Sequence, residues 1–221
     1  TFLAEMLKKT HYDLRELDGL EVTAASLTDD RADVNNPVPM IYQSGYLTIK
    51  GYDTELRLYK LGYPNDEVKY GFLNFITPFY TSLDESKAPF YIGQFVKELR
   101  AGDVEAFLTR LRAFFADFPY ELNDKTERHY QVVFYLVFKL LGQFINAEVQ
   151  SALGRADAVV KTANAVYVFE FKLNGTAEEA LAQINSKEYA IPYQVGDWKI
   201  IKVGVNFDSA TRTIGTWKTE R

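Results

Sequence analysis

The sequence has 221 residues, of which 47% are hydrophobic and 25% are charged, and its formal net charge is −5. The absence of cysteine excludes disulfide bonds, thiolate metal sites and cysteine nucleophiles, and it favours a reducing compartment. No apolar run approaches membrane-spanning length and the N-terminus lacks the pattern of a signal peptide, so we expect a cytoplasmic protein.

The pattern of residues 1–65 predicts helices followed by a two-stranded ribbon. A short helix, "TFLAEMLKK", is followed by the polar loop 28–39, and "MIYQSGYLTIK" then begins a small helix-then-strand unit. After Gly51, "TELRLYKLGYPN" alternates as a second strand until Pro64. This order predicts a winged-helix-like module. Its recognition-helix equivalent is not visibly basic, so we interpret the module as a structural adaptor rather than a DNA reader.

Residues 66–124 predict a helical connector. In "GDVEAFLTRLRAFFADFPY", Asp103 stands in an N-cap position and apolar residues recur at helical spacing until Pro119. These apolar residues lack interleaved Arg or Lys on the same face, so we expect them to form core rather than a base-stacking platform.

The pattern of residues 125–221 predicts secondary-structure elements in the order helix, three strands, helix, two strands. The first helix is "DKTERHYQVVFYLVFKLLG", and the second is "TAEEALAQINSKEYA", in which Thr176 and Glu179 are spaced as a capping box. Residues 125–221 hold 12 basic and 10 acidic residues, a net charge of +2, which leaves 13 basic and 20 acidic residues and −7 for 1–124. A polyanion should therefore meet the C-terminal part.

Three charges interrupt the stretch "GRADAVVKTANAVYVFEFK" at 154–172, which otherwise predicts two buried strands. If strands 155–161 and 166–172 form a hairpin closed by "TANA", Asp157 faces Glu170. Directly opposed residues of an antiparallel pair point to the same face, with Cβ atoms roughly 4.5 to 5.5 Å apart. Two carboxylates so placed repel unless something neutralises them.

Period-two alternation places Lys172 on the face of Glu170, and Phe169 and Phe171 on the other face. Burying two carboxylates is unfavourable unless they are paired or bind a metal, and one lysine balances only one of them. Mg²⁺ prefers oxygen ligands from one or two carboxylates together with substrate phosphates. The trio therefore predicts metal-assisted phosphodiester hydrolysis. The alternative is a buried ion cluster with no substrate.

These residues resemble a known nuclease pattern. Asp157, then Glu170-Phe171-Lys172 after an apolar strand, then a helix carrying Gln183, is similar to the PD-(D/E)xK nuclease superfamily. More closely, "ERHYQ", "GRADAVV", "VFEFKL", "ALAQINSKEYA" and "VGVNF" resemble the nuclease domain at the C-terminus of bacterial proteins that begin with an AAA-ATPase-like domain. Upstream, "YQSGYLTIKGYD" and "LGYPNDEV" resemble the end of that ATPase-like region.

The resemblance implies an α/β fold in which a restriction-endonuclease-like mixed sheet is flanked by helices, at 125–221. Residues 1–65 would be a winged-helix-like remnant of the ATPase-like region, followed by the connector at 66–124. The sequence starts at Thr1 inside an expected helix, so we expect more of the ATPase-like region upstream. No G-x-x-x-x-G-K-[ST] motif occurs, so this chain is not expected to bind ATP.

The resemblance also implies a metal site for Mg²⁺ or Mn²⁺. Asp157 and Glu170 would be ligands, with the Phe171 carbonyl as a third, and Glu127 matches a position that often supports the metal. The dipeptide before the first ligand reads Ala156-Asp157 instead of Pro-Asp, which weakens the motif but not the chemistry.

Three further residues receive roles by resemblance. Lys172 would orient the attacking water or stabilise charge on the phosphate. Gln183 matches the motif glutamine of RecB-like members, and Lys187 lies four residues on, where it could touch phosphate. For Gln183 and Lys187 an exposed helix face is an equal alternative.

The expected function is therefore that of a metal-dependent nuclease that hydrolyses phosphodiester bonds, with DNA as the expected nucleic acid. The competing hypothesis is a non-catalytic module that keeps the nuclease fold and regulates or anchors an ATPase-like protein. Intact Asp157, Glu170 and Lys172 favour the enzyme, whereas the acidic N-terminal part and the missing ATP motif leave the second hypothesis open.

Overall fold

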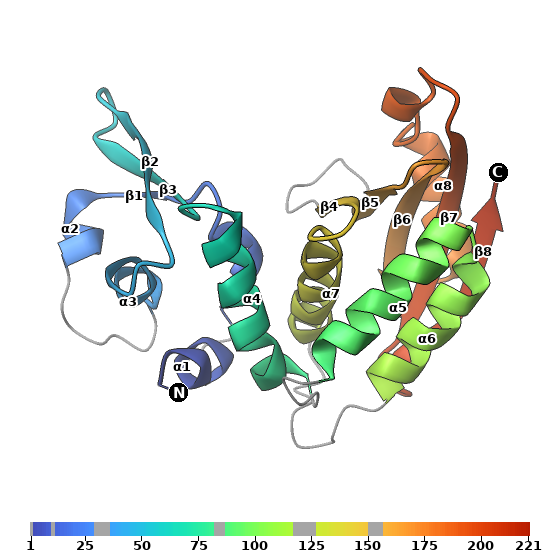
Figure 1. Cartoon of the computed structure of the whole chain (residues 1–221), viewed down its shortest axis with the longest axis horizontal. Coiled ribbons are helices and arrows are strands. Elements are labelled where there is room, and N and C mark those ends of the chain that lie inside the picture. Colours follow the sequence, from blue (N-terminus) through green and yellow to red (C-terminus); the bar gives the residue numbers. More distant parts are fainter. Residues whose placement is uncertain (1, 10–11, 29–35, 82–86, 117–126, 150–156) are drawn as a thin grey trace. The chain divides into compact units, whose positions relative to one another are not determined.

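The computed structural model, shown in Figure 1, describes residues 2–9, 12–28, 36–81, 87–116, 127–149 and 157–221. The chain divides into two compact units, Thr1–Thr81 and Ser82–Arg221. None of the helices in these described ranges combines the length and the apolar character that crossing a membrane requires.

In the described residues of the first unit, helices accompany a three-stranded antiparallel sheet of order β1-β3-β2. The elements are α1 (Phe2–Lys9), η1 (Leu14–Glu16), β1 (Glu21–Val22), α2 (Ala24–Thr28), α3 (Val38–Gln43), β2 (Thr48–Asp53), β3 (Leu58–Gly62) and α4 (Asp66–Tyr80). The predicted ribbon is present as β2 and β3. The winged-helix assignment of residues 1–65 stays a prediction.

The second unit contains the helices and strands that carry the candidate site. Its elements are α5 (Ala88–Ala101), α6 (Val104–Ala116), α7 (Glu127–Leu141), β4 (Asn146–Val149), β5 (Ala158–Lys161), β6 (Ala165–Leu173), α8 (Ala177–Ser186), η3 (Ile191–Tyr193), β7 (Lys199–Asp208) and β8 (Thr213–Glu220). From α7 to β8 the order is the predicted one, and the α/β class with a mixed sheet flanked by helices is confirmed. The division into functional segments at 65/66 and 124/125 stays a prediction.

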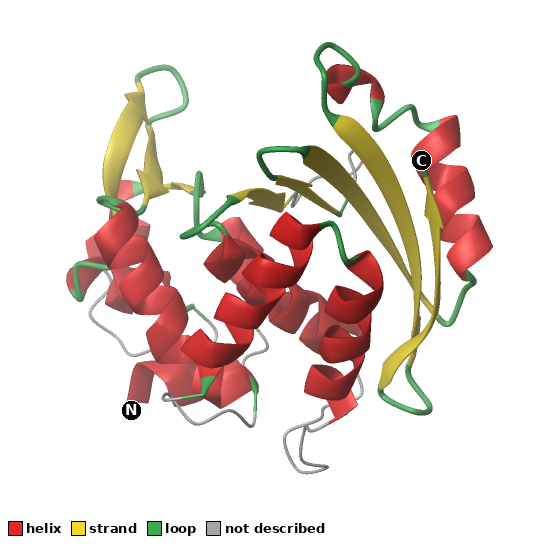
Figure 2. Cartoon of the chain, turned by 45° about the vertical axis from the view of Figure 1, so that its right-hand side comes forward, coloured by secondary structure: helices red, strands yellow, loops and turns green. Residues whose placement is uncertain are grey.

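The strands of this unit form one sheet of order β4-β5-β6-β7-β8. β6 and β7 are parallel, and the other neighbouring pairs are antiparallel. Parallel neighbours need a crossover connection, and here α8 supplies it and packs against β6 and β7. Figure 2 shows α8 on one face of the sheet and α5, α6 and α7 on the other.

The central strand β6 is buried from both sides, because its side chains alternate between two apolar layers. Phe169 contacts Phe107 of α6 and Phe138 of α7, with ring centroids 5.7 and 5.3 Å away. Val168 faces the other way and lies in a buried cluster with Ile184 of α8. By the same alternation, Glu170 and Lys172 share one face, as the sequence pattern predicted, and this is the face that α8 covers.

Helix α8 begins with the predicted capping box. The Thr176 hydroxyl accepts the Glu179 backbone N–H at 3.0 Å, and the Glu179 carboxylate accepts the Thr176 N–H at 2.8 Å. The preceding turn is held from β7, because Asn206 donates from Nδ2 to the Gly175 carbonyl at 2.6 Å. These hydrogen bonds fix the start of α8 relative to the end of β6, which carries Lys172.

Gly204 allows α8 to lie directly on β7. A β-carbon at this position would collide with the Ala177 carbonyl oxygen and would lie 2.8 Å from the Leu181 nitrogen, both of them backbone atoms of α8. Gly204→Ala is expected to destabilise the protein by about 1 to 3 kcal/mol, since the helix must shift away from the sheet. Urea unfolding monitored by circular dichroism measures the change.

Gly93, in the middle of α5, provides the matched control. No atom lies within 4 Å of a β-carbon built there, so Gly93→Ala should stabilise the protein by roughly 0.5 to 1 kcal/mol through helix propensity. Equal stability changes in the two variants would contradict the close approach of α8 to β7.

Candidate active site

The predicted hairpin has the predicted register. β5 and β6 pair from Ala158 opposite Phe169 to Lys161 opposite Val166, so the position opposite Glu170 is that of Asp157. Asp157 stands just before β5, and its Oδ2 atom accepts the Phe171 backbone N–H at 2.8 Å. The carboxylate thus gives this strand amide a side-chain acceptor.

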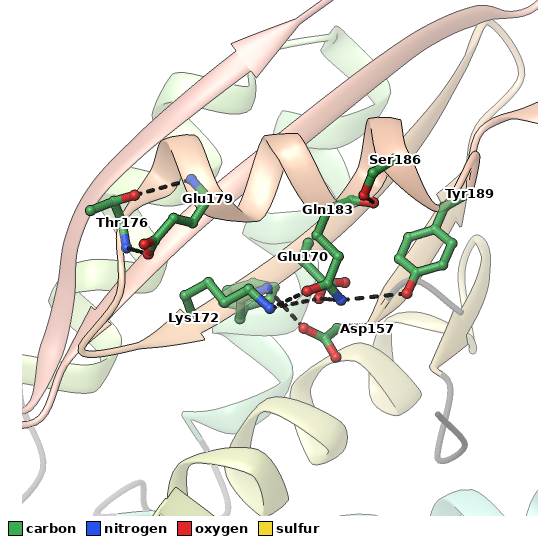
Figure 3. A network of polar contacts seen from close by, with 9 residues as sticks. Asp157, Glu170, Lys172, Thr176, Glu179, Gln183, Ser186 and Tyr189 are labelled. Atoms are coloured by element: carbon green, nitrogen blue, oxygen red, sulfur yellow. Dashed lines mark hydrogen bonds and ion pairs between the residues drawn. The ribbon is translucent and has the colours of Figure 1, made fainter. Parts of the chain in front are cut away.

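Glu170, Lys172 and Gln183 form one hydrogen-bonded group between β6 and α8 (Figure 3). Lys172 Nζ lies 3.4 Å from Glu170 Oε1 and also donates to Gln183 Oε1. Gln183 Nε2 donates to the same Glu170 oxygen. The amide therefore connects the lysine to the carboxylate, and α8 fixes the Lys172 ammonium through Gln183.

The Glu170 carboxylate is the most unusual group of this cluster, because it is only 3% exposed. Its Oε1 atom accepts both hydrogen bonds, whereas Oε2 is buried without a hydrogen-bond partner among the described residues. The pKa of Glu170 is raised to about 7: burial is the largest cause, the Asp157 carboxylate adds to the rise, and Lys172 and the Asp157 backbone N–H act in the opposite direction.

This raised pKa predicts a pH-dependent stability. The pKa of Glu170 is about 7 in the folded chain against an ordinary value of 4.5, so the folded state holds the proton more tightly. The contribution of Glu170 to the free energy of unfolding is fully present below pH 4.5 and is lost as the pH rises through 7. Without divalent metal, Glu170→Gln should therefore be more stable than wild type at about pH 8, by up to roughly 3 kcal/mol, and the gain should vanish at acidic pH.

Urea unfolding in EDTA over this pH range measures the effect. The control is Glu178→Gln, because Glu178 is an exposed carboxylate that pairs with Lys218 at 2.6 Å. A gain at alkaline pH of the same size in both variants would show that the Glu170 carboxylate is not selectively destabilised.

The donor set fits a hard divalent cation. The unpartnered Glu170 Oε2 and the Asp157 carboxylate are both oxygen ligands of the type that Mg²⁺ accepts. In an extended strand the N–H and C=O of one residue point to the same side, so the Phe171 carbonyl is directed to the side of Asp157, with which the Phe171 N–H bonds. Among the described residues no group of three or more His, Asp or Glu side chains gathers.

Two of the predicted site residues lie at helix ends. Lys187 is the exposed C-cap residue just after α8, and its N–H still bonds the Gln183 carbonyl, four residues back, at 3.0 Å. Glu127 is the first residue of α7, and its side chain lies outside the described residues. The roles of all the predicted site residues stay predictions.

Sequence reasoning missed Tyr189, whose hydroxyl is 3.4 Å from Gln183 Nε2. No pattern along the chain singles this residue out. It reaches the site because the chain folds back after α8, and that reversal depends on the backbone of Lys187 and Glu188.

Comparison with known proteins bears on this arrangement. Residues 125–217, which include the mixed sheet and all the clustered residues, match the family model described as the PD-(D/E)XK nuclease superfamily. The chain is also 30% identical over 234 residues to an "Uncharacterized protein in vnfD 5'region" of Azotobacter chroococcum mcd 1, an alignment that covers 97% of this chain and 43% of that protein. The chain thus spans less than half the length of this relative. No solved structure matches the chain.

Proposed function

We propose that residues 125–221 form a metal-dependent nuclease that hydrolyses phosphodiester bonds in DNA. One observation carries the proposal: a buried carboxylate with an unpartnered oxygen, Glu170, stands opposite Asp157 and beside a lysine fixed by Gln183. Two opposed carboxylates with one lysine beside them leave a negative charge that a divalent cation would balance. The match of residues 125–217 to the nuclease superfamily supports the same proposal.

In this proposal Asp157, Glu170 and the Phe171 carbonyl hold Mg²⁺ or Mn²⁺. The metal, when bound, would neutralise charge on the phosphate and lower the pKa of a bound water. Glu170 would offer Oε2 to the cation, because its Oε1 is occupied by Lys172 and Gln183. Glu127 would support the site from α7.

Lys172 supplies the charge that acts on the reacting groups. Its ammonium is held by Glu170 and Gln183, so it is oriented before substrate arrives and can donate to the attacking water or to the scissile phosphate. Its aliphatic stem packs against the turn at Gly175. Removing the ammonium would therefore affect the reaction more than the fold.

The charge distribution favours residues 125–221 as the nucleic-acid-binding part, since they carry +2 whereas 1–124 carry −7. We propose that residues 1–65 are a winged-helix-like adaptor of an AAA-ATPase-like region, joined by the segment 66–124. We also propose that the protein acts in the cytoplasm of a bacterium and that Lys187 contributes a phosphate contact from the end of α8.

A cleavage assay tests the proposal directly. The chain is incubated with labelled duplex DNA, single-stranded DNA and RNA in Mg²⁺, in Mn²⁺ and in EDTA. We expect cleavage of DNA in either metal and none in EDTA. Binding of DNA without cleavage under every condition would instead favour the non-catalytic module. The net acidic charge of residues 1–124 and the missing ATP motif keep that hypothesis open.

A further inference from the structure

The hydrogen bonds of Gln183 leave it no donor for substrate. A primary amide has two N–H donors and one carbonyl oxygen. Both donors of Gln183 have partners, because Nε2 donates to Glu170 Oε1 and, over a long 3.4 Å, to the Tyr189 hydroxyl. The carbonyl oxygen accepts from Lys172. A phosphate oxygen needs a donor, so Gln183 in this arrangement organises its neighbours instead of binding phosphate.

The amide also has a fixed orientation. Turning it over would place its carbonyl oxygen against the Glu170 carboxylate and its NH₂ group against the Lys172 ammonium, and both contacts are repulsive. The two charged partners therefore determine which end of the amide faces Tyr189, and that end is a donor. The tyrosine oxygen must accept.

Tyr189 consequently keeps its own hydroxyl hydrogen. In the part of the chain that the structure describes, Gln183 is the one hydrogen-bond partner of the Tyr189 hydroxyl. Figure 3 shows this hydroxyl pointing toward the group formed by Gln183, Glu170 and Lys172, with the Asp157 carboxylate below them. A hydroxyl that accepts one hydrogen bond and retains its donor can serve an incoming acceptor at this edge.

The backbone after α8 places the Tyr189 ring firmly. The Tyr189 N–H bonds the Ile184 carbonyl and the Glu188 N–H bonds the Asn185 carbonyl, each at 3.1 Å, while Glu188 is left-handed with φ 54°. These are the two hydrogen bonds of a Schellman motif. The Tyr189 ring then packs in the apolar cluster with Ile184 and is 9% exposed. Only the hydroxyl end of this side chain reaches the polar site.

We infer that Tyr189 is a substrate-binding residue whose hydroxyl donates to a phosphate oxygen of the bound nucleic acid, and that Gln183 is a positioning residue for Lys172. The inference rests on the proposed nuclease function. Tyr189 acts on binding, because its ring is anchored in the core and its hydroxyl carries no charge to the reacting phosphate. Gln183 affects the rate, because it holds the Lys172 ammonium, which carries a positive charge to the reacting phosphate.

The test compares Tyr189→Phe and Gln183→Met with wild type, by steady-state cleavage of labelled duplex DNA. A hydrogen bond to a charged group is worth about a tenfold change or more in affinity. Tyr189→Phe should therefore raise KM about tenfold with kcat little changed, and Gln183→Met should lower kcat about tenfold with KM little changed. Tyr91→Phe is the control, since Tyr91 lies in α5 and its ring packs against Phe95 and Phe114, and it should behave as wild type.

Duplexes with a single methylphosphonate, moved stepwise along one strand, locate the contact. Removing the phosphate charge at one position should weaken wild-type binding about tenfold and should leave Tyr189→Phe unaffected at that position. If wild type cleaves, two results would overturn the inference. One is that the affinity losses caused by the methylphosphonate and by Tyr189→Phe add at every position, and the other is an unchanged KM in Tyr189→Phe. Failure of wild type to bind or cleave any duplex would instead overturn the proposed function, and the inference with it.

Discussion

Lys172→Ala is expected to keep metal binding and to lose cleavage by about a hundredfold to a thousandfold, the usual effect of removing one preorganised electrostatic contact. The ammonium is not a metal ligand, and it contacts only Glu170 Oε1 and Gln183 Oε1 in the described structure. Its loss removes charge from the reacting groups and leaves Glu170 Oε2 and Asp157 in place. Single-turnover cleavage and isothermal titration with Mn²⁺ measure the two properties separately.

The metal titration should be made at about pH 8. Lys172 holds the pKa of Glu170 below the value that burial and Asp157 would otherwise produce, so without it protons compete more strongly with the metal near neutral pH. Lys172→Met keeps the aliphatic stem against Gly175 and should show the same loss of rate. Lys199→Ala removes an exposed lysine of β7 and should cleave normally. Cleavage at the wild-type rate in Lys172→Ala would place the activity elsewhere.

Asp157→Asn is expected to abolish both the rise in melting temperature caused by Mg²⁺ or Mn²⁺ and the metal-dependent cleavage. A ligand that binds only the folded state stabilises it by mass action, and the asparagine removes one of two carboxylates. The asparagine oxygen can still accept the Phe171 N–H, so the strand end should persist. Differential scanning calorimetry with increasing metal, followed by the cleavage assay, gives both results.

In the same variant the pKa of Glu170 should fall, since the Asp157 carboxylate is one of the causes that raise it. Asp208→Asn is the matched control, because it removes the same charge from the end of β7, where the carboxylate accepts the Ala210 N–H at 2.8 Å. A metal-induced melting shift in Asp157→Asn equal to that of wild type would remove Asp157 from the metal site.

The sequence was sufficient to predict the register that brings the carboxylates together. Strand alternation and the short loop "TANA" leave one register that buries the apolar faces of both β5 and β6, and that register sets Asp157 opposite Glu170. The alternation of Phe169 and Glu170 likewise predicted that Glu170 and Lys172 share one face of the sheet. These features are local, so a pattern along the chain is enough to find them.

The ends of α8 show where such reasoning fails. The capping box at Thr176 is a local signal and was predicted correctly. The C-terminus was placed too late, because no glycine marks it and Glu188 instead adopts the left-handed conformation. Its hydrogen bonds and the burial of Tyr189 compensate for this strain, and both depend on tertiary packing. Tyr189 was consequently missed.

The hydrogen bond between the Phe171 amide and Asp157 gives the site a built-in spectroscopic reporter. Most amides of β6 face another main chain, whereas this one faces a carboxylate. Its nitrogen and proton resonances should therefore respond to any cation or proton that Asp157 acquires. A single cross-peak in an ¹⁵N-correlated spectrum of the labelled protein would then follow loading of the site in real time, without nucleic acid and without turnover.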